Sequence, residues 1–159
     1  MKILFTALLL FISPVIAGEI KQQDFKHIEI IKAEFGLIEN NQLIPSEKVP
    51  LIIGQTYGWR IELNTNKPKI KWREQFILPK APKTWGGVNK IAGSNAISTD
   101  KRVSITEREV IPENGVISNA WSVVQGDPTG RYMIRVIIEN QQERVFTFDV
   151  ETPTIKKSY

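Results

Sequence analysis

Residues 130–150 read GRYMIRVIIENQQERVFTFDV, and this stretch decides the fold class. Apolar and polar residues alternate with a period of two over residues 130–139 and again over residues 143–150. This is the period of a β-strand with one buried face, and β-branched and aromatic residues fill both runs. The three residues Asn140-Gln141-Gln142 between them predict a hairpin with a loop of about three residues.

The same period of two recurs upstream. It is present in residues 27–38, 56–63, 69–78 and, weakly, 102–110. Residues 49–53 are a short apolar run, which we interpret together with residues 56–63 as one strand pair or one bent strand. Residues 118–124 predict a further short strand. Residues 79–100 are rich in Pro, Gly, Ser and Asn, so we expect a long loop there. About seven or eight short strands without a helical period favour an all-β fold of two packed antiparallel sheets, and an open barrel is the second possibility.

The turn residues of 126–130 directly precede the strand that contains Tyr132. A tyrosine two positions after Gly130 matches a tyrosine corner, in which the hydroxyl bonds to backbone a few residues upstream. The alternative is that Tyr132 is an ordinary core aromatic.

The order of these features resembles a known family. The resemblance to the secreted bacterial domain-of-unknown-function family numbered 3859 runs over residues 28–150 and rests on Phe35-Gly36, Val49-Pro50, Gly54, Tyr57-Gly58, the proline-rich middle and the closing hairpin. It implies an immunoglobulin-like β-sandwich without a known activity, so no catalytic residue is carried over. This chain departs from the pattern at Arg131-Tyr132, where we expect a tryptophan.

The N-terminus has the features of an export signal. Lys2, the apolar residues 3–12 and Ala17 before Gly18 predict a cleavable signal helix over residues 1–17. We expect a polar linker over residues 18–26, the sandwich domain over residues 27–152 and a polar tail over residues 153–159. The exported protein should be periplasmic or secreted, without stable membrane insertion; an uncleaved N-terminal anchor is the alternative.

Composition limits the chemistry. The 159 residues include no cysteine and one histidine, which excludes disulfides and thiolate metal sites and leaves little for imidazole clusters. No phosphate loop or serine elbow occurs, so we expect no enzyme activity, no cofactor and no metal.

His27 is expected at the surface. Glu107 and Glu109 could form a carboxylate pair for glycoside hydrolysis or cation binding, but a solvated acidic edge is favoured.

The basic residues are concentrated in the middle of the chain. Between Lys67 and Arg102 there are nine basic and two acidic residues, although the whole chain has a net charge of only +4. Such a segment could attract an acidic protein, anionic lipid headgroups or nucleic acid, and export argues against nucleic acid. The alternative is that these lysines only solvate one strand and its loops.

The remaining candidate site residues are among the tryptophans and include one glutamate on an apolar strand face. Trp59, Trp72 and Trp121 are expected in the core, whereas Trp85 lies between Pro82 and Gly86 in the basic loop. Trp85 is there either a recognition hot spot or a plug over the end of the sandwich. Glu74 falls on the apolar face of its strand, so it should pair with Arg60 or Arg135, unless a bulge turns it outward.

These features predict a non-catalytic binding or accessory module that docks an acidic protein partner. The predicted partner-binding residues are Trp85, Lys83, Lys80, Lys69, Lys71 and Arg73. The alternative is a carbohydrate or cell-wall binder, in which Trp85 stacks on a sugar ring.

Overall fold

The computed structural model describes residues 27–85 and 94–153, and all regular structure in these ranges is β-strand. The prediction of an all-β fold is therefore confirmed. The strands are β1 (Ile28–Glu39), β2 (Gln42–Pro45), β3 (Lys48–Pro50), β4 (Thr56–Thr65), β5 (Ile70–Ile77), β6 (Ser94–Ile97), β7 (Val103–Val110), β8 (Val116–Ser122), β9 (Gly130–Ile138) and β10 (Gln142–Glu151).

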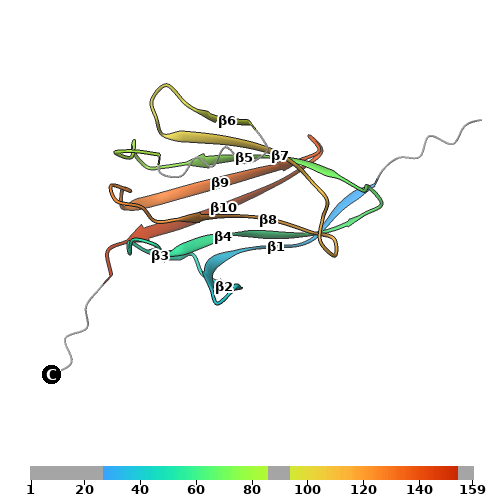
Figure 1. Ribbon diagram of the computed structural model, residues 1–159, viewed down its shortest axis with the longest axis horizontal. Helices are drawn as coiled ribbons and strands as arrows, with labels where there is room; N and C mark the ends of the chain where they lie inside the picture. The colour runs from blue at the N-terminus through green and yellow to red at the C-terminus, as the bar shows by residue number, and fades with distance from the viewer. Residues whose placement is uncertain (1–26, 86–93, 154–159) are drawn as a thin grey trace, which may run out of the picture.

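The strands form two sheets that lie face to face (Figure 1). One sheet has the order β2-β1-β4-β8 and the other the order β3-β10-β9-β5-β7-β6. Neighbouring strands are antiparallel except for β3 and β10, which run parallel. Because the two sheets are separate, the structure is the predicted sandwich and not the open barrel.

The hairpin that the closing stretch predicts is present. β9 and β10 pair from Gln142 opposite Ile138 to Val150 opposite Gly130. Glu139 and Asn140 have positive φ angles of 51° and 56°, which form the turn, so it begins one residue earlier than the sequence indicates.

The pairing of residues 49–53 with residues 56–63 was wrong. β3 belongs to the six-stranded sheet and β4 to the four-stranded sheet, so the chain changes sheets between them. The change occurs at a turn where Gln55 donates its backbone N–H to the carbonyl of Ile52 at 2.9 Å. Gly54, with a φ of 88°, supplies the backbone conformation that other residues rarely adopt.

Two short strands, β2 and β6, match none of the predicted runs, which is why the described residues contain more strands than the predicted seven or eight. β6 lies within the predicted loop of residues 79–100, so that prediction was wrong for residues 94–97. Pairing with β7 determines this strand, because its Ser, Asn and Ala residues carry no strand signal of their own.

Aromatic rings from both sheets fill one end of the core. Phe35 of β1 stacks on Phe148 of β10 with 4.3 Å between ring centroids, and Phe76 of β5 lies 4.7 Å from Trp121 of β8. Trp59 and Trp72 are buried, as expected, whereas Trp121 is half-buried. These contacts join the two sheets near the loops that follow β5 and β8.

Tyr132 forms the predicted corner. Its side chain is buried, and its hydroxyl donates to the carbonyl of Pro128 at 2.7 Å. This bond ties the start of β9 to the loop after β8, so Tyr132 is both a core aromatic and a corner residue.

The signal helix of residues 1–17, the linker of residues 18–26 and the tail beyond Pro153 lie outside the described residues. The boundaries drawn for these segments and for the domain of residues 27–152 stay predictions. Among the described residues, no helix is long and apolar enough to cross a membrane.

Tyr132→Phe should lower the free energy of unfolding by about 1 kcal/mol, because it removes one buried hydrogen bond and leaves the Pro128 carbonyl without this donor. Urea denaturation measures the change. The control is Tyr57→Phe, since the Tyr57 hydroxyl has no hydrogen bond within the described ranges. Equal losses in both variants would show that the corner bond adds nothing.

Candidate functional site

Trp85 lies across the end of the aromatic core. Its ring packs edge-on against Phe76 at 6.0 Å and against Trp121 at 6.4 Å between centroids. Its Nε1 donates to the carbonyl of Lys101 at 2.9 Å. The side chain is half-buried, so Trp85 covers the core, as the plug alternative expects, and keeps part of its indole at the surface.

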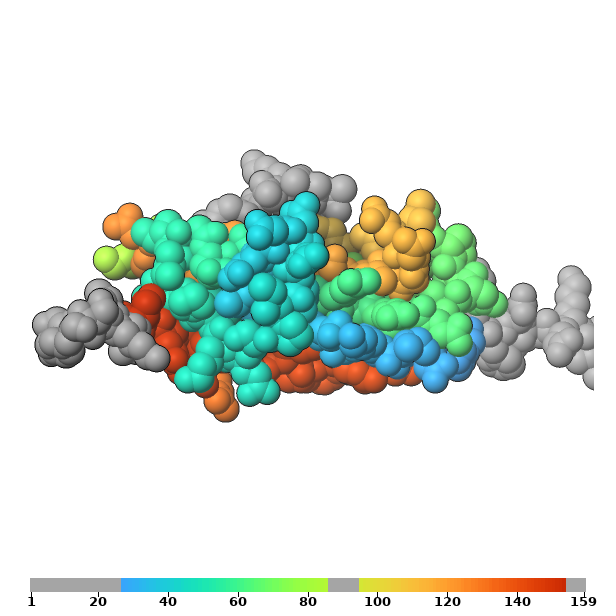
Figure 2. All heavy atoms as spheres, turned by 90° about the horizontal axis from the view of Figure 1, so that it is seen from below, coloured from blue at the N-terminus to red at the C-terminus, as the bar shows by residue number. Residues whose placement is uncertain are grey.

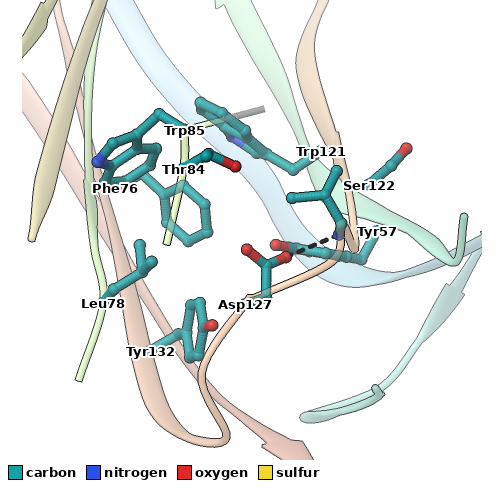
Figure 3. A pocket seen from close by; sticks show the side chains of 10 residues that line it. Tyr57, Phe76, Leu78, Thr84, Trp85, Trp121, Ser122, Asp127 and Tyr132 are labelled. Atoms are coloured by element: carbon teal, nitrogen blue, oxygen red, sulfur yellow. Dashed lines mark hydrogen bonds between the residues drawn. The ribbon is translucent and has the colours of Figure 1, made fainter. Parts of the chain in front are cut away.

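A small cavity lies beneath Trp85 (Figure 3). It has a volume of about 20 Å³, room for about one water molecule. Its walls are the rings of Tyr57, Phe76, Trp85, Trp121 and Tyr132, with Asp127 at one side. The cavity is therefore too small for a sugar ring.

Asp127 is the acidic group of this cavity. Its carboxylate accepts the backbone N–H of Val124 at 2.9 Å, which closes the turn after β8. Burial raises the pKa of Asp127, and the hydrogen bond from Val124 partly opposes that rise. Burial also raises the pKa of Tyr57, with Asp127 as a further cause. Since the carboxylate closes a turn, its place in the fold has a structural explanation.

The predicted basic strand face is largely neutralised by β7. Lys69 and Lys71 lie 3.8 and 3.6 Å from the carboxylate of Glu109, and Arg73 lies 3.5 Å from that of Glu107. The register explains this, because Lys71 is opposite Glu109 and Arg73 is opposite Glu107 across the two strands. We call Lys69, Lys71 and Arg73 the strand patch.

Lys80 and Lys83 lie beyond the other end of β5, in the segment that leads to Trp85. Both side chains are exposed, and neither has an ion pair within residues 27–85 and 94–153. We call Lys80, Lys83 and Trp85 the loop end. The six predicted residues are thus spread along β5 in two groups instead of forming one cluster.

Glu74 is the most deeply buried charged residue of the core, with 0% exposure. Its carboxylate accepts three indole or amide N–H groups from the opposite sheet: Trp59 Nε1, Asn119 Nδ2 at 3.1 Å and Trp121 Nε1 at 2.9 Å. Burial raises the pKa of Glu74 above its ordinary value of 4.5, and these three donors oppose the rise.

The predicted partners of Glu74 were wrong. Arg135 bonds Glu143 at 2.7 Å on the outer face, and Arg60 is exposed on β4. No bulge turns Glu74 outward, because its register with Thr106 and Val136 is continuous. The sequence did offer a signal for the true partners: Trp59 and Trp121 fall on apolar faces, and a buried indole N–H requires an acceptor.

A wide hollow lies on the outer face of the four-stranded sheet, between the β1–β2 hairpin and the loop before β8 (Figure 2). Its volume is about 740 Å³. No sequence feature predicted it, because its walls come from three separate stretches of the chain, at residue 41, residues 60–62 and residues 110–118. The polar side chains that line it are Asn41, Arg60, Glu62, Glu113, Asn114 and Ser118.

His27 is exposed and lies 3.6 Å from the carboxylate of Glu29. Within the described ranges, no three His, Cys, Asp or Glu side chains are grouped so that they could hold a metal ion. Glu107 and Glu109, the possible carboxylate pair of the sequence analysis, lie next to Arg73 and Lys71 of β5.

Glu74→Gln should lower the free energy of unfolding by about 3 kcal/mol, because one acceptor oxygen becomes an N–H₂ group that faces buried donors. Since the folded pKa is raised, Glu74 stabilises the fold most below its unfolded pKa of 4.5 and less as the pH rises through the folded pKa. The difference from wild type should therefore shrink as the pH rises from about 4.5 toward neutral.

Denaturation over this pH range tests the prediction, with the exposed Glu62→Gln as control. A difference that grows toward neutral pH would contradict the direction of the pKa shift.

Trp85→Ala should lower the free energy of unfolding by about 2 kcal/mol, less than a fully buried tryptophan, because only part of the ring is covered. Trp85→Phe should lower the free energy of unfolding by less than Trp85→Ala does. It keeps an aromatic ring against Phe76 and Trp121 and loses only the hydrogen bond to the Lys101 carbonyl. Thermal melting compares the variants. Unchanged melting in Trp85→Ala would mean that the ring does not cover the core in solution.

The comparisons with known proteins agree on the architecture. A family model described as the PM0630 beta sandwich domain matches residues 33–151. A crystal structure of an immunoglobulin-like protein from Pseudomonas aeruginosa is similar with a TM-score of 0.50 and 16% sequence identity, over 79% of this chain and 97% of that one. At this identity the likeness shows the fold alone. The comparison with curated proteins gives no match.

Proposed function

This chain belongs to the PM0630 beta sandwich domain family, and on that premise we propose that it is a non-catalytic binding or accessory module that docks an acidic protein partner through the loop end. The features of residues 1–17 support a periplasmic or secreted location. The resemblance to the secreted family numbered 3859 stays a prediction, with which the sandwich architecture is consistent.

The observation that supports this proposal most is the contrast between the two basic groups. The strand patch faces Glu107 and Glu109, whereas Lys80 and Lys83 are exposed without an ion pair in the described ranges. Cations that no neighbour neutralises attract an acidic surface over the longest distance. We therefore propose that Lys80, Lys83 and Trp85 contact the partner and that Lys69, Lys71 and Arg73 add only long-range attraction.

Trp85 has the geometry of an anchor that is already in place. Its indole is held by Phe76, Trp121 and the Lys101 carbonyl, so a partner that covers its exposed part would order little further side chain. Preorganised aromatic side chains are common among the residues that dominate interfaces.

The non-catalytic character is part of the proposal. An acid–base pair needs two carboxyl groups free to face a substrate, and Glu107 and Glu109 face Arg73 and Lys71 instead. Glu74 and Asp127 are each engaged by N–H donors that have a structural role.

The carbohydrate alternative is favoured by one observation, the polar hollow on the four-stranded sheet. Its volume is within the range of small-molecule sites, and it exposes Arg60, Asn114 and Ser118. This location differs from the predicted Trp85 site. Retention on peptidoglycan that Arg60→Ala abolishes and Trp85→Ala preserves would favour this alternative.

The partner proposal is tested by quantitative affinity capture from periplasmic extract. The double variant Lys80→Glu with Lys83→Glu should lower capture of the specific partner at least about tenfold, and its association should weaken with salt, because exposed charges are screened beyond about 10 Å at 0.1 M ionic strength. The matched control is Lys69→Glu with Lys71→Glu, which should change capture less.

Trp85→Ala should speed dissociation, measured on the folded fraction. Equal effects of the two charge reversals would contradict the assignment to the loop end. Unchanged affinity of folded Trp85→Ala would remove the tryptophan from the interface.

A further inference from the structure

The turn between β3 and β4 exposes two large apolar side chains. Ile52 is 50% exposed and Ile53 is 72% exposed. We call these two residues the apolar tip. Turns normally carry Gly, Pro, Asn, Asp or Ser at such positions, so two adjacent isoleucines there are unusual. Neither side chain contributes to the core.

The backbone holds the apolar tip outward. Leu51 donates to the carbonyl of Glu151 at 2.7 Å, Gly54 donates to that of Val123 at 2.9 Å, and Val123 donates to that of Gln55 at 2.9 Å. The turn is thus anchored to the ends of both β10 and β8. Because these bonds fix the backbone on both sides, the isoleucines cannot fold back without breaking them.

Lys80 and Lys83, which form no ion pair with any residue that the structure describes, follow β5 at the same end of the sandwich. Val123, which bonds Gly54 and Gln55 just after the apolar tip, leads into the loop whose Gly126 accepts the backbone N–H of Lys83 at 3.4 Å. The aliphatic chain of Lys83 packs against Gly126. In Figure 1, the loops after β3, β5 and β8 all lie at the left end of the molecule.

The acidic groups of this end are mostly engaged. Glu151 pairs with Lys48 at 2.9 Å, Asp149 pairs with Arg131 at 2.7 Å, and Asp127 faces the cavity of Figure 3. Glu47 is exposed without an ion pair in the described ranges, and its charge acts on Arg131. The end therefore combines a protruding apolar tip with exposed positive charge.

We propose that this end docks reversibly on an anionic phospholipid surface, with Ile52 and Ile53 entering the interfacial layer and Lys80 and Lys83 contacting headgroup phosphates. A convex tip suits a bilayer, which has no shape to match, better than a protein, which would need a pocket for it. Apolar burial and attraction of lysines to anionic lipid together determine such binding. The contact is peripheral, and because it uses Lys80 and Lys83 of the loop end, lipid would compete with the acidic partner proposed above for these two lysines.

The test is sedimentation of the chain from Gly18 onward with vesicles of phosphatidylcholine that contain about one third phosphatidylglycerol. Ile52→Asn with Ile53→Asn should weaken binding about tenfold. Lys80→Glu with Lys83→Glu should weaken it at least about fivefold per lysine. Since all four side chains are exposed, each variant should melt as wild type does.

Two matched controls use the same residue types elsewhere. Ile111, 71% exposed, follows β7 at the opposite end of the sandwich, so Ile111→Asn should change vesicle binding less than about twofold. Lys69→Glu with Lys71→Glu, in the strand patch, should also have a small effect.

Three results would overturn the proposal. The wild-type protein could fail to sediment with anionic vesicles, or it could bind pure phosphatidylcholine vesicles as strongly as anionic ones. Ile111→Asn could also weaken vesicle binding as much as the apolar-tip variant does. If the wild-type protein does not bind vesicles and the apolar-tip variant no longer captures the protein partner, the tip contacts a protein and the lipid proposal is wrong.

Discussion

The carboxylate of Glu74 is the interaction on which the rest of this sandwich depends. It comes from β5 of the six-stranded sheet and accepts N–H groups from Trp59 of β4 and from Asn119 and Trp121 of β8 in the other sheet. Apolar contacts between sheets are non-directional, so they allow one sheet to slide on the other. Hydrogen bonds from three donors to one buried group allow a single alignment. Glu74 therefore sets how the two sheets lie on each other.

This alignment extends to the surface through Trp121. The same indole that donates to Glu74 packs on Phe76 and on Trp85, which lies over the end of the core. The position of Trp85 thus follows from contacts that begin at the buried carboxylate. The Tyr132 corner holds the neighbouring loop after β8, and that loop in turn carries the backbone bonds to Lys83 and to the apolar tip. One end of the molecule is in this way built from the core outward.

The basic segment illustrates why local charge is a poor guide to a binding surface. Over residues 67–102 the sequence is strongly basic, yet across the sheet the strand patch meets the carboxylates of β7. Cross-strand neighbours are determined by register, and register is invisible in a count along the chain. Within the described part of this segment, Lys80 and Lys83 have no ion pair, because they lie beyond the last paired residue of β5, where no strand lies opposite. The loop end and the apolar tip consequently lie at the same end of the sandwich.

The sequence by itself determined the strand class and the closing hairpin, because a period of two with β-branched residues is a local property that burial of one sheet face requires. It also placed Glu74 on the apolar face of its strand and indicated that Tyr132 can form a corner, since both depend on position along one strand, but only the continuous register of β5 showed that no bulge turns Glu74 outward. Only the tertiary structure decided the partners of Glu74, which come from a sheet that is formed by distant segments. It alone decided that β3 and β4 separate into different sheets and that β6 is a strand, because backbone pairing with β10 and β7 outweighs weak local preference. The neutralised strand patch and the exposed apolar tip were decided in the same way, since register and loop anchoring arise only when the sheets are assembled.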